Sequence, residues 1–396
     1  MDEARNWVES RMWTPKELKK NDGVLSKNKT IMVKQSDTVR SFMYSERERR
    51  DRLSTKSEFD RVALTELSTA DFIDRIEYQC QDKSSAYYYW TSGDAFNADV
   101  RDELRKTFQN MRDRNGCKEA SLSPSIWMGG LGTCTQAHYD VLDNIFIQLH
   151  GEKRFHLWPP SDVTSLHFFP DAHSRSRKSQ VNDVLCPSAK DYETFPFLKD
   201  VSKPLVFTLS PGDALFIPSF WVHFVEVVSS EASVSINSFN EENTKRLAGN
   251  VLSHPSPVRF GSRNQIANVT HQRRLRENTP LRYRRKIFRD AAGLLGVSSK
   301  CLNRLYISRF SSLTTDFSSL SNRDGDDADL SIDEGEIDII SRHLTLLSSN
   351  LLESGVDETY VTGVTEIVLH HLMEKWALSL FEPNDVSIAL SASDYH

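Results

Sequence analysis

The chain reads Thr135-Gln136-Ala137-His138-Tyr139-Asp140-Val141-Leu142-Asp143-Asn144-Ile145-Phe146-Ile147-Gln148-Leu149-His150-Gly151-Glu152-Lys153-Arg154 through the segment that decides its fold. Within it, Asn144–Leu149 is a mostly apolar run that is typical of a buried strand. Gly151 follows as a turn residue, and Arg154–Trp158 is a second strand-like run. Two such runs around a glycine predict a β-hairpin.

A candidate metal site begins in the same segment. The period-two alternation of a strand puts His138 and Asp140 on one face, and His223 lies 85 residues after His138 on another predicted strand. Two imidazoles and a carboxylate on one side of a metal leave the opposite positions open, as in the facial triad of non-haem Fe(II) oxygenases. The plainer interpretation of each histidine is a hydrogen-bonded core residue, since the chain has 12 of them.

Two polar residues of the segment suggest a carboxylate ligand. Lys153 opens an apolar strand, where an ammonium is costly unless it is paired or neutralised. A cosubstrate carboxylate would pair it; the alternative is a lysine at a hairpin tip that points to water. Asn144 shares the face of Asp140, but a straight strand would hold it about 13 Å further on. Direct contact with a cofactor therefore requires a bend near Asp143.

Short strands separated by turn residues continue from about residue 85 to residue 240, which argues for a sandwich or a small barrel. Before them, Ser68 or Thr69 is expected to cap a helix that continues to Ile76. The further strand candidates are Tyr87–Trp90, Leu205–Phe207, Ala214–Ile217, His223–Val228 and Ser233–Asn237.

The flanks are strongly charged. Residues 259–289 carry ten Arg or Lys against one acid, whereas residues 324–338 carry eight acids and no base. The basic stretch could contact phosphates, or its arginines could be solvated or paired with acids of this chain. The acidic stretch is typical of a solvated linker, and apolar residues at helical spacing from Val364 to Trp376 predict a buried helix face.

Composition further limits the class of protein to which this chain could belong. The net charge is −6, and no window of 18 apolar residues exists that would predict a membrane span. The five cysteines are odd in number and form no Cys-x-x-Cys motif, so we expect free thiols and a cytoplasmic or nuclear location.

These motifs, together with Pro211–Pro218 and Trp221-Val222-His223, resemble the JmjC/cupin-like hydroxylases, which depend on Fe(II) and 2-oxoglutarate. Within that family the segment looks most like the tRNA wybutosine hydroxylases, and next like the asparaginyl hydroxylases of the factor-inhibiting-HIF type. The likeness covers roughly residues 13–313. It implies an α+β, mainly β fold: a double-stranded β-helix (jelly roll) with N-terminal flanking elements and C-terminal helices.

The resemblance also implies site residues. It makes His138, Asp140 and His223 the iron ligands and pairs Lys153 with the distal carboxylate of 2-oxoglutarate. Thr135 and Tyr88 would add hydroxyl donors, although alternation does not choose the inward ring among Tyr87, Tyr88 and Tyr89. The residues placed near the proximal carboxylate are Asn144 and Asn237.

Pattern and likeness together divide the chain into five predicted parts. An apolar first strand before Trp13 is missing, so we expect either that the chain is truncated there or that the sheet edge is built differently. No counterpart is recognised for the tail after about residue 320. The parts are 1–84 (N-terminal flank), 85–245 (jelly-roll catalytic core), 246–320 (basic helical region), 321–338 (acidic linker) and 339–396 (C-terminal helical segment).

The function expected from the resemblance is hydroxylation of a macromolecule, with O₂ as cosubstrate and succinate as coproduct. A modified tRNA base fits the basic stretch, and a protein side chain is the alternative substrate. The alternative from another functional class is a non-catalytic cupin-type binding protein. This hypothesis requires that the metal site is not used for catalysis. The family likeness further implies a homodimer through helices near residues 280–313.

Overall fold

The computed structural model describes most of the chain in two compact units, which are treated separately. Of the described residues, the first unit comprises those up to Trp158 and those within Lys203–Lys245, and the second comprises Pro159–Ser202 and those from Arg246 onward. The described residues are 13–20, 30–36, 41–42, 62–81, 86–93, 95–114, 124–240, 243–260, 279–313, 330–381 and 385–391.

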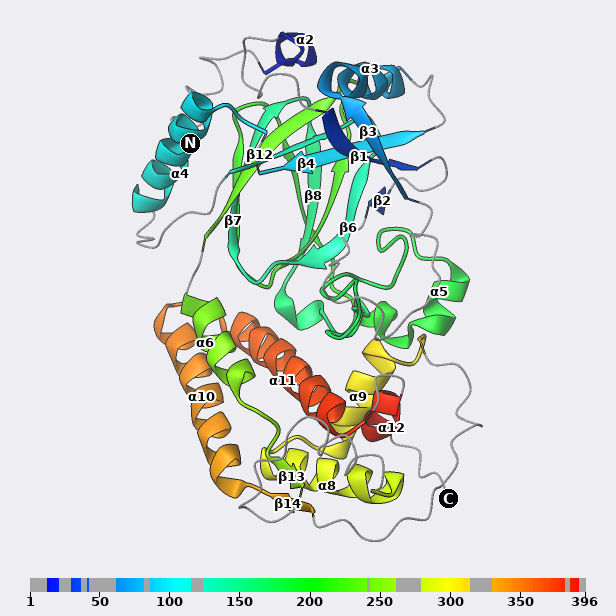
Figure 1. The fold of residues 1–396 in the computed structure, drawn as a ribbon, viewed down its shortest axis with the longest axis vertical. Helices are drawn as coiled ribbons and strands as arrows, with labels where there is room; N and C mark the ends of the chain where they lie inside the picture. Colours follow the sequence, from blue (N-terminus) through cyan, green and yellow to red (C-terminus); the bar gives the residue numbers. More distant parts are fainter. Residues whose placement is uncertain are drawn as a thin grey trace. The chain divides into compact units, whose positions relative to one another are not determined.

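The first unit contains two β-sheets (Figure 1). One has seven strands in the order β10-β7-β12-β5-β4-β1-β3, and the other has five in the order β2-β6-β11-β8-β9. All pairs are antiparallel except β2 with β6, and the predicted jelly roll is thereby confirmed. The strands are β1 Thr30–Ser36, β2 Ser41–Phe42, β3 Ala63–Ser68, β4 Tyr87–Ser92, β5 Ser125–Gly129, β6 Cys134–Tyr139, β7 Asp143–His150, β8 Lys153–Trp158, β9 Leu205–Leu209, β10 Ala214–Ile217, β11 Val222–Val227 and β12 Ser233–Asn240.

The predicted hairpin between β7 and β8 is wrong, because the two strands lie in different sheets. β7 pairs with β10 and β12, whereas β8 pairs with β11 and β9. Gly151 makes the crossing at φ +65°, and a Cβ there would meet the carbonyl oxygen of Ala232 at 2.8 Å. The sequence identified the turn, but a strand buried on both faces offers no alternation from which to choose its partner.

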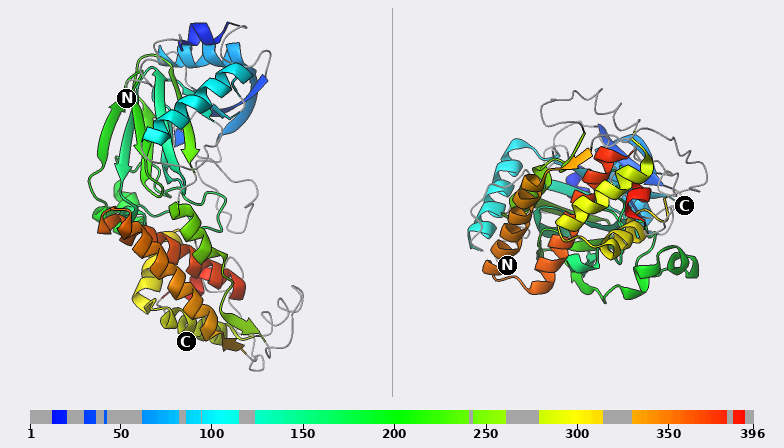
Figure 2. Two further views of the ribbon diagram at one scale, coloured as in Figure 1. Left: turned by 90° about the vertical axis from the view of Figure 1, so that its left-hand side faces the viewer. Right: turned by 90° about the horizontal axis from the view of Figure 1, so that it is seen from below.

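Two apolar layers hold the first unit together. Helices α3 (Thr69–Cys80) and α4 (Ala98–Arg114) cover the outer face of the seven-stranded sheet (Figure 2). Their Phe72 and Leu104 belong to the apolar cluster formed with residues of this sheet. α3 starts as predicted, with the Ser68 hydroxyl accepting the Asp71 N–H at 3.0 Å. Between the sheets, Phe146 of β7 meets Phe155 of β8 with ring centroids 4.8 Å apart.

The second unit is mainly helical, and α10 and α11 lie side by side in it (Figure 2). The predicted apolar stripe from Val364 to Trp376 lies on α11 and is buried, as expected. Its elements are α5 Ala189–Thr194, α6 Asn243–Ser253, α8 Leu281–Leu294, α9 Ser299–Arg309, α10 Glu334–Glu353, α11 Glu358–Leu380, α12 Val386–Leu390, the 3₁₀ turns Pro160–Asp162 and Pro196–Asp200, and the strands β13 Val258–Phe260 and β14 Leu330–Ile332.

The described part of the predicted acidic linker is regular structure. Leu330–Ile332 pairs with β13, and Asp333 caps α10 by accepting the N–H of Glu336 at 3.2 Å. Acidic side chains are favourable at this end of a helix, because the first turn exposes N–H groups and the positive end of the dipole. Within the described residues, no helix is both long enough and apolar enough to cross a membrane. Dimerisation through α8 and α9 stays a prediction.

A buried ion pair joins residues 159–202 to the helices. Arg309 at the end of α9 and Glu374 of α11 lie 2.8 Å apart and are almost fully buried, and Glu374 also accepts the backbone N–H of Asp171. Thr164 donates to Glu366 of α11 at 2.7 Å. The predicted segment 85–245 is therefore interrupted, since residues 159–202 pack with the second unit. The alternation of strands carried no sign of this insertion.

We expect Arg309→Met to weaken the packing of α11. Removing one partner leaves a buried charge uncompensated, which costs about 3 kcal/mol, or about a 100-fold faster opening of the helix. Hydrogen–deuterium exchange of α11 peptides measures it. The double variant Arg309→Met/Glu374→Leu should recover most of the loss, and Lys286→Met, at an exposed pair with Asp290, should change little. A single variant that exchanges like the wild type would contradict the account.

Candidate metal centre

The pairing of β6 with β11 creates the site. The strands are antiparallel with His223 opposite His138, but further along Val225 lies opposite Thr135. β6 therefore carries one extra residue between Thr135 and His138, which is a β-bulge. Val225 packs in the apolar cluster between the sheets. The bulge lets Thr135 and His138 both face this space, although simple alternation would put them on opposite faces.

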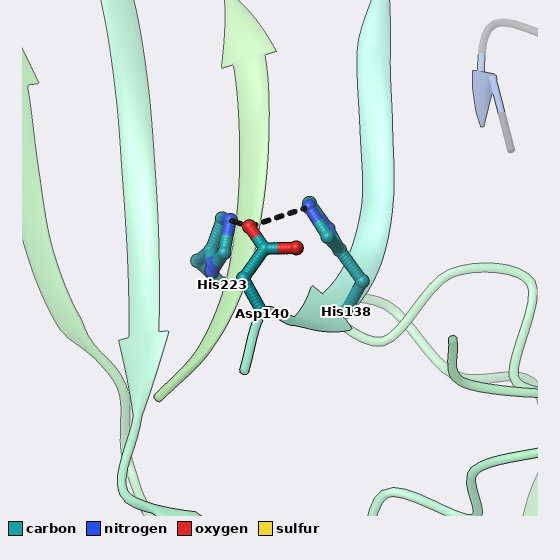
Figure 3. Close-up of side chains that lie close together, drawn as sticks. All are labelled: His138, Asp140 and His223. Atoms are coloured by element: carbon teal, nitrogen blue, oxygen red, sulfur yellow. Dashed lines mark ion pairs between the residues drawn. The ribbon is translucent and has the colours of Figure 1, made fainter. Parts of the chain in front are cut away.

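Three ligand atoms converge at the end of this strand pair (Figure 3). The Asp140 Oδ2 lies 4.0 Å from the His138 Nε2 and 3.8 Å from the His223 Nε2, and the imidazole centroids are 4.1 Å apart. All three ligand atoms lie within 4.8 Å of one another. Within the described residues, no second group of three His, Cys, Asp or Glu side chains is gathered in this way. The predicted triad is thus brought together.

The turn before β11 is tied to the bend after β6. Phe220, at φ +64°, donates its N–H to the Asp140 carbonyl at 2.7 Å, and Ser219 donates to the Asp143 carboxylate at 2.7 Å. A positive φ is strained for a bulky residue, so the surrounding bonds must hold it. The chain bends between Asp140 and Asp143, where the sequence required a bend, and then enters the other sheet.

Both imidazoles are set for metal binding by their backbone partners. The Nδ1 of His138 lies 2.7 Å from the Gln136 carbonyl, and the Nδ1 of His223 lies 3.2 Å from the Trp221 carbonyl. A carbonyl only accepts, so each Nδ1 carries the proton and each Nε2 keeps its lone pair. Burial lowers the pKa of His223 while Asp140 opposes the shift, and this favours the neutral, ligating ring. The donor set fits a divalent transition metal.

Lys153 reaches across the space between the sheets. It is 3% exposed and donates to the Ser235 hydroxyl of β12 at 2.7 Å, with its Nζ 5.3 Å from the centre of the Phe146 ring. Burial lowers the pKa of Lys153 to about 7. No carboxylate of the described residues pairs with it. The sequence left two orientations of Lys153 open, and its burial excludes the lysine that points to water from a hairpin tip.

Asn144 and Asn237 lie on the same inner face. The Trp127 indole donates to the Asn237 Oδ1 at 2.7 Å, and the Asn237 Nδ2 donates to the Asn144 Oδ1 at 2.9 Å. An indole N–H only donates, so these bonds fix the orientation of both amides. The Asn144 Nδ2 is left with no acceptor among the described residues. This amide nitrogen is therefore a buried donor that could bind a ligand acceptor.

Thr135 meets Tyr89, and this corrects the choice of Tyr88. The Tyr89 hydroxyl lies 3.0 Å from the Thr135 hydroxyl, and its ring stacks on Phe42. Tyr88 lies on the opposite face of β4, where the Arg75 guanidinium contacts its hydroxyl at 3.4 Å and covers its ring. Alternation separates the two rings but does not say which face is inner, so the sequence left this open. Burial raises the pKa of Tyr89 and keeps its hydroxyl protonated.

Sequence reasoning did not single out Ser235 or Trp127. Both are inward residues of strands that pair with each other, Ser235 opposite Trp127. Their signal was weak, because a serine in a strand and a tryptophan beside apolar residues are ordinary core occupants. Only the cross-strand register shows that they contact Lys153 and Asn237.

Comparison with known proteins identifies the class. Residues 2–245 match the family described as the cupin-like domain, so the chain belongs to the cupin-like family, whose relatives here are JmjC-type proteins. It is 33% identical over 163 residues to human HSPB1-associated protein 1, covering 41% of this chain and 31% of that protein. It is 33% identical over 158 residues to tRNA wybutosine-synthesizing protein 5 of Gallus gallus, covering 39% of this chain and 46% of that protein.

A third relative is tRNA wybutosine-synthesizing protein 4 of Neurospora crassa, 37% identical over 102 residues, which are 26% of this chain and 8% of that protein. The matched segments thus span less than half the length of each of these three relatives.

The triad predicts one metal ion per chain. Co(II), whose absorption reports its ligands, should bind in equimolar amount, and His223→Ala or Asp140→Ala should weaken binding by about 100-fold or more, because each removes a ligand. Equilibrium titration followed by absorption measures this. His150→Ala is the matched control, since His150 pairs with Glu231 outside the triad. Equal Co(II) affinity in wild type and His223→Ala would refute the site.

Proposed function

We propose that this protein is an Fe(II)- and 2-oxoglutarate-dependent oxygenase that hydroxylates a macromolecular substrate. The observation that carries the proposal is the convergence of His138, Asp140 and His223, with a buried lysine further along β8 that lacks a carboxylate partner among the described residues. A facial triad leaves coordination positions open for a chelating 2-oxo acid and for O₂. The bound iron and 2-oxoglutarate would supply the oxidation of a substrate C–H bond, with succinate and CO₂ as coproducts.

The residues of the chain would position the cosubstrate. The Lys153 ammonium would pair with the distal carboxylate, and the Thr135 and Tyr89 hydroxyls could donate to the same end. The Asn144 amide would donate to the proximal carboxylate. The neutral Nε2 atoms of the histidines would hold the metal, and the apolar layer around Phe146 and Phe155 would exclude water from the lysine.

A modified tRNA base is the substrate class that we favour. Its support is the two relatives named tRNA wybutosine-synthesizing proteins, which align over parts of this chain. A protein side chain is the second candidate, and one observation favours it. In the basic stretch, Arg284 donates to the Leu380 carbonyl at 2.7 Å, and Arg285 and Arg289 donate to the Ser391 carbonyl. These guanidinium groups cap the C-terminal carbonyls of α11 and α12, so they are less available to bind phosphates.

Turnover tests the proposal directly. Purified protein with Fe(II), 2-oxoglutarate and O₂ should form succinate, faster when the true substrate class is added, because substrate couples to the oxidation. Bulk tRNA and a protein extract, each added alone, separate the two substrate candidates. His138→Ala should abolish succinate formation. Absence of succinate under every condition, with the metal site loaded, would instead favour a non-catalytic cupin-type protein.

Lys153 should make 2-oxoglutarate binding depend on pH. Its pKa is about 7 in the free protein, so it is increasingly neutral above pH 7, whereas pairing with a carboxylate requires the ammonium. Binding then takes up a proton, and Kd should rise by up to about tenfold per pH unit above pH 7. Calorimetry between pH 6.5 and 8.5 measures Kd and proton uptake.

The matched control is Lys153→Arg, which stays charged over this range and should therefore give a flat profile. A wild-type Kd that is constant from pH 7 to pH 8.5 would remove Lys153 from the binding site.

A further inference from the structure

Trp127 of β5 hydrogen-bonds to two polar side chains of the neighbouring strand β12, Asn237 and Ser235. Its indole Nε1 donates to Asn237 at 2.7 Å, and its backbone carbonyl accepts the Ser235 hydroxyl at 3.3 Å. Ser235 in turn accepts the ammonium of Lys153 at 2.7 Å, and Asn237 donates to Asn144 at 2.9 Å. One residue therefore begins two hydrogen-bonded chains, which end at the Lys153 ammonium and at the Asn144 amide.

The direction of donation in each chain is determined. In the first, the indole can only donate, so Asn237 must present its oxygen to Trp127 and its NH₂ to Asn144. Asn144 then presents its oxygen to Asn237, which leaves its own NH₂ as the outer end. In the second, Ser235 donates to a carbonyl, so its oxygen lone pair is turned toward Lys153. Both outer ends are donors, which suits an anionic ligand at each.

We propose that Trp127 is a positioning residue that sets the donor orientation of Asn144, and with it the affinity for the cosubstrate. The inference rests on the function proposed above. Without the indole N–H, the Asn237 amide is free to turn over, and Asn144 turns with it. An amide oxygen would then face the proximal carboxylate and repel it. Asn144 and Asn237 are 5% and 1% exposed, so water does not readily replace the hydrogen bond that fixed the orientation of their amides.

Binding of 2-oxoglutarate to the metal-loaded protein without O₂ tests this step, because it requires no turnover. Trp127→Phe keeps an aromatic ring but removes the donor, and should raise Kd by about fivefold to tenfold, the worth of one neutral hydrogen bond. Asn237→Asp should raise Kd further, since a carboxylate accepts from Trp127 but forces Asn144 to donate to it. Metal affinity should stay unchanged in both variants.

A double-mutant cycle separates positioning from ring packing. In an Asn237→Leu background the amide chain is absent, so Trp127→Phe should cause no further loss of 2-oxoglutarate affinity. If Trp127→Phe weakens binding equally in both backgrounds, the ring acts only by packing and the inference is wrong; unchanged binding in Trp127→Phe alone also overturns it. Failure of the wild-type protein to bind 2-oxoglutarate at all would instead overturn the proposed function.

Discussion

The antiparallel register of β6 and β11 is the constraint on which the rest of the site depends. It sets His138 directly across from His223, and the bulge in β6 restores Thr135 to the same inner face. A slip of one residue in β6 would turn His138 and Thr135 to the outer face and away from His223, because strand side chains alternate with a period of two. The hydrogen bonds from Ser219 to Asp143 and from Phe220 to Asp140 hold this register at the end of the strand pair where Asp140 joins the two histidines.

The inner face of the first unit combines apolar packing with a polar strip that folding alone does not favour. Burial of Lys153 opposes its charge, and burial of Asn144 and Asn237 requires that their amides be bonded. The main apolar core, against α3 and α4, lies on the other face of the seven-stranded sheet. The apolar core on the outer face therefore stabilises the seven-stranded sheet, while its inner face can carry polar side chains. A charged ligand bound there would accept hydrogen bonds from the donors on that face.

Period-two patterning in the sequence predicted a sandwich or small barrel and put His138 and Asp140 on one strand face, whereas the resemblance to the JmjC/cupin-like hydroxylases implied the jelly roll and the triad with His223. The sequence did not predict the β-bulge, the crossing of the chain at Gly151 or the choice of Tyr89 over Tyr88. Each depends on which strand lies opposite which, and pairing is a long-range property that local alternation does not encode. The same holds for residues 159–202, whose buried contacts with α9 and α11 involve partners more than 100 residues away.

The central claim is that His138, Asp140 and His223 share one metal ion beside a cosubstrate held by Lys153. A crystal structure of the protein grown without O₂ in Fe(II) and 2-oxoglutarate tests it most directly, with anomalous scattering to locate the iron. The account predicts a single iron bonded to both Nε2 atoms and to the Asp140 carboxylate at about 2.1 Å, with 2-oxoglutarate reaching from the metal to the Lys153 ammonium. Iron bound elsewhere, or a triad with one side chain turned away from the ion, would contradict it.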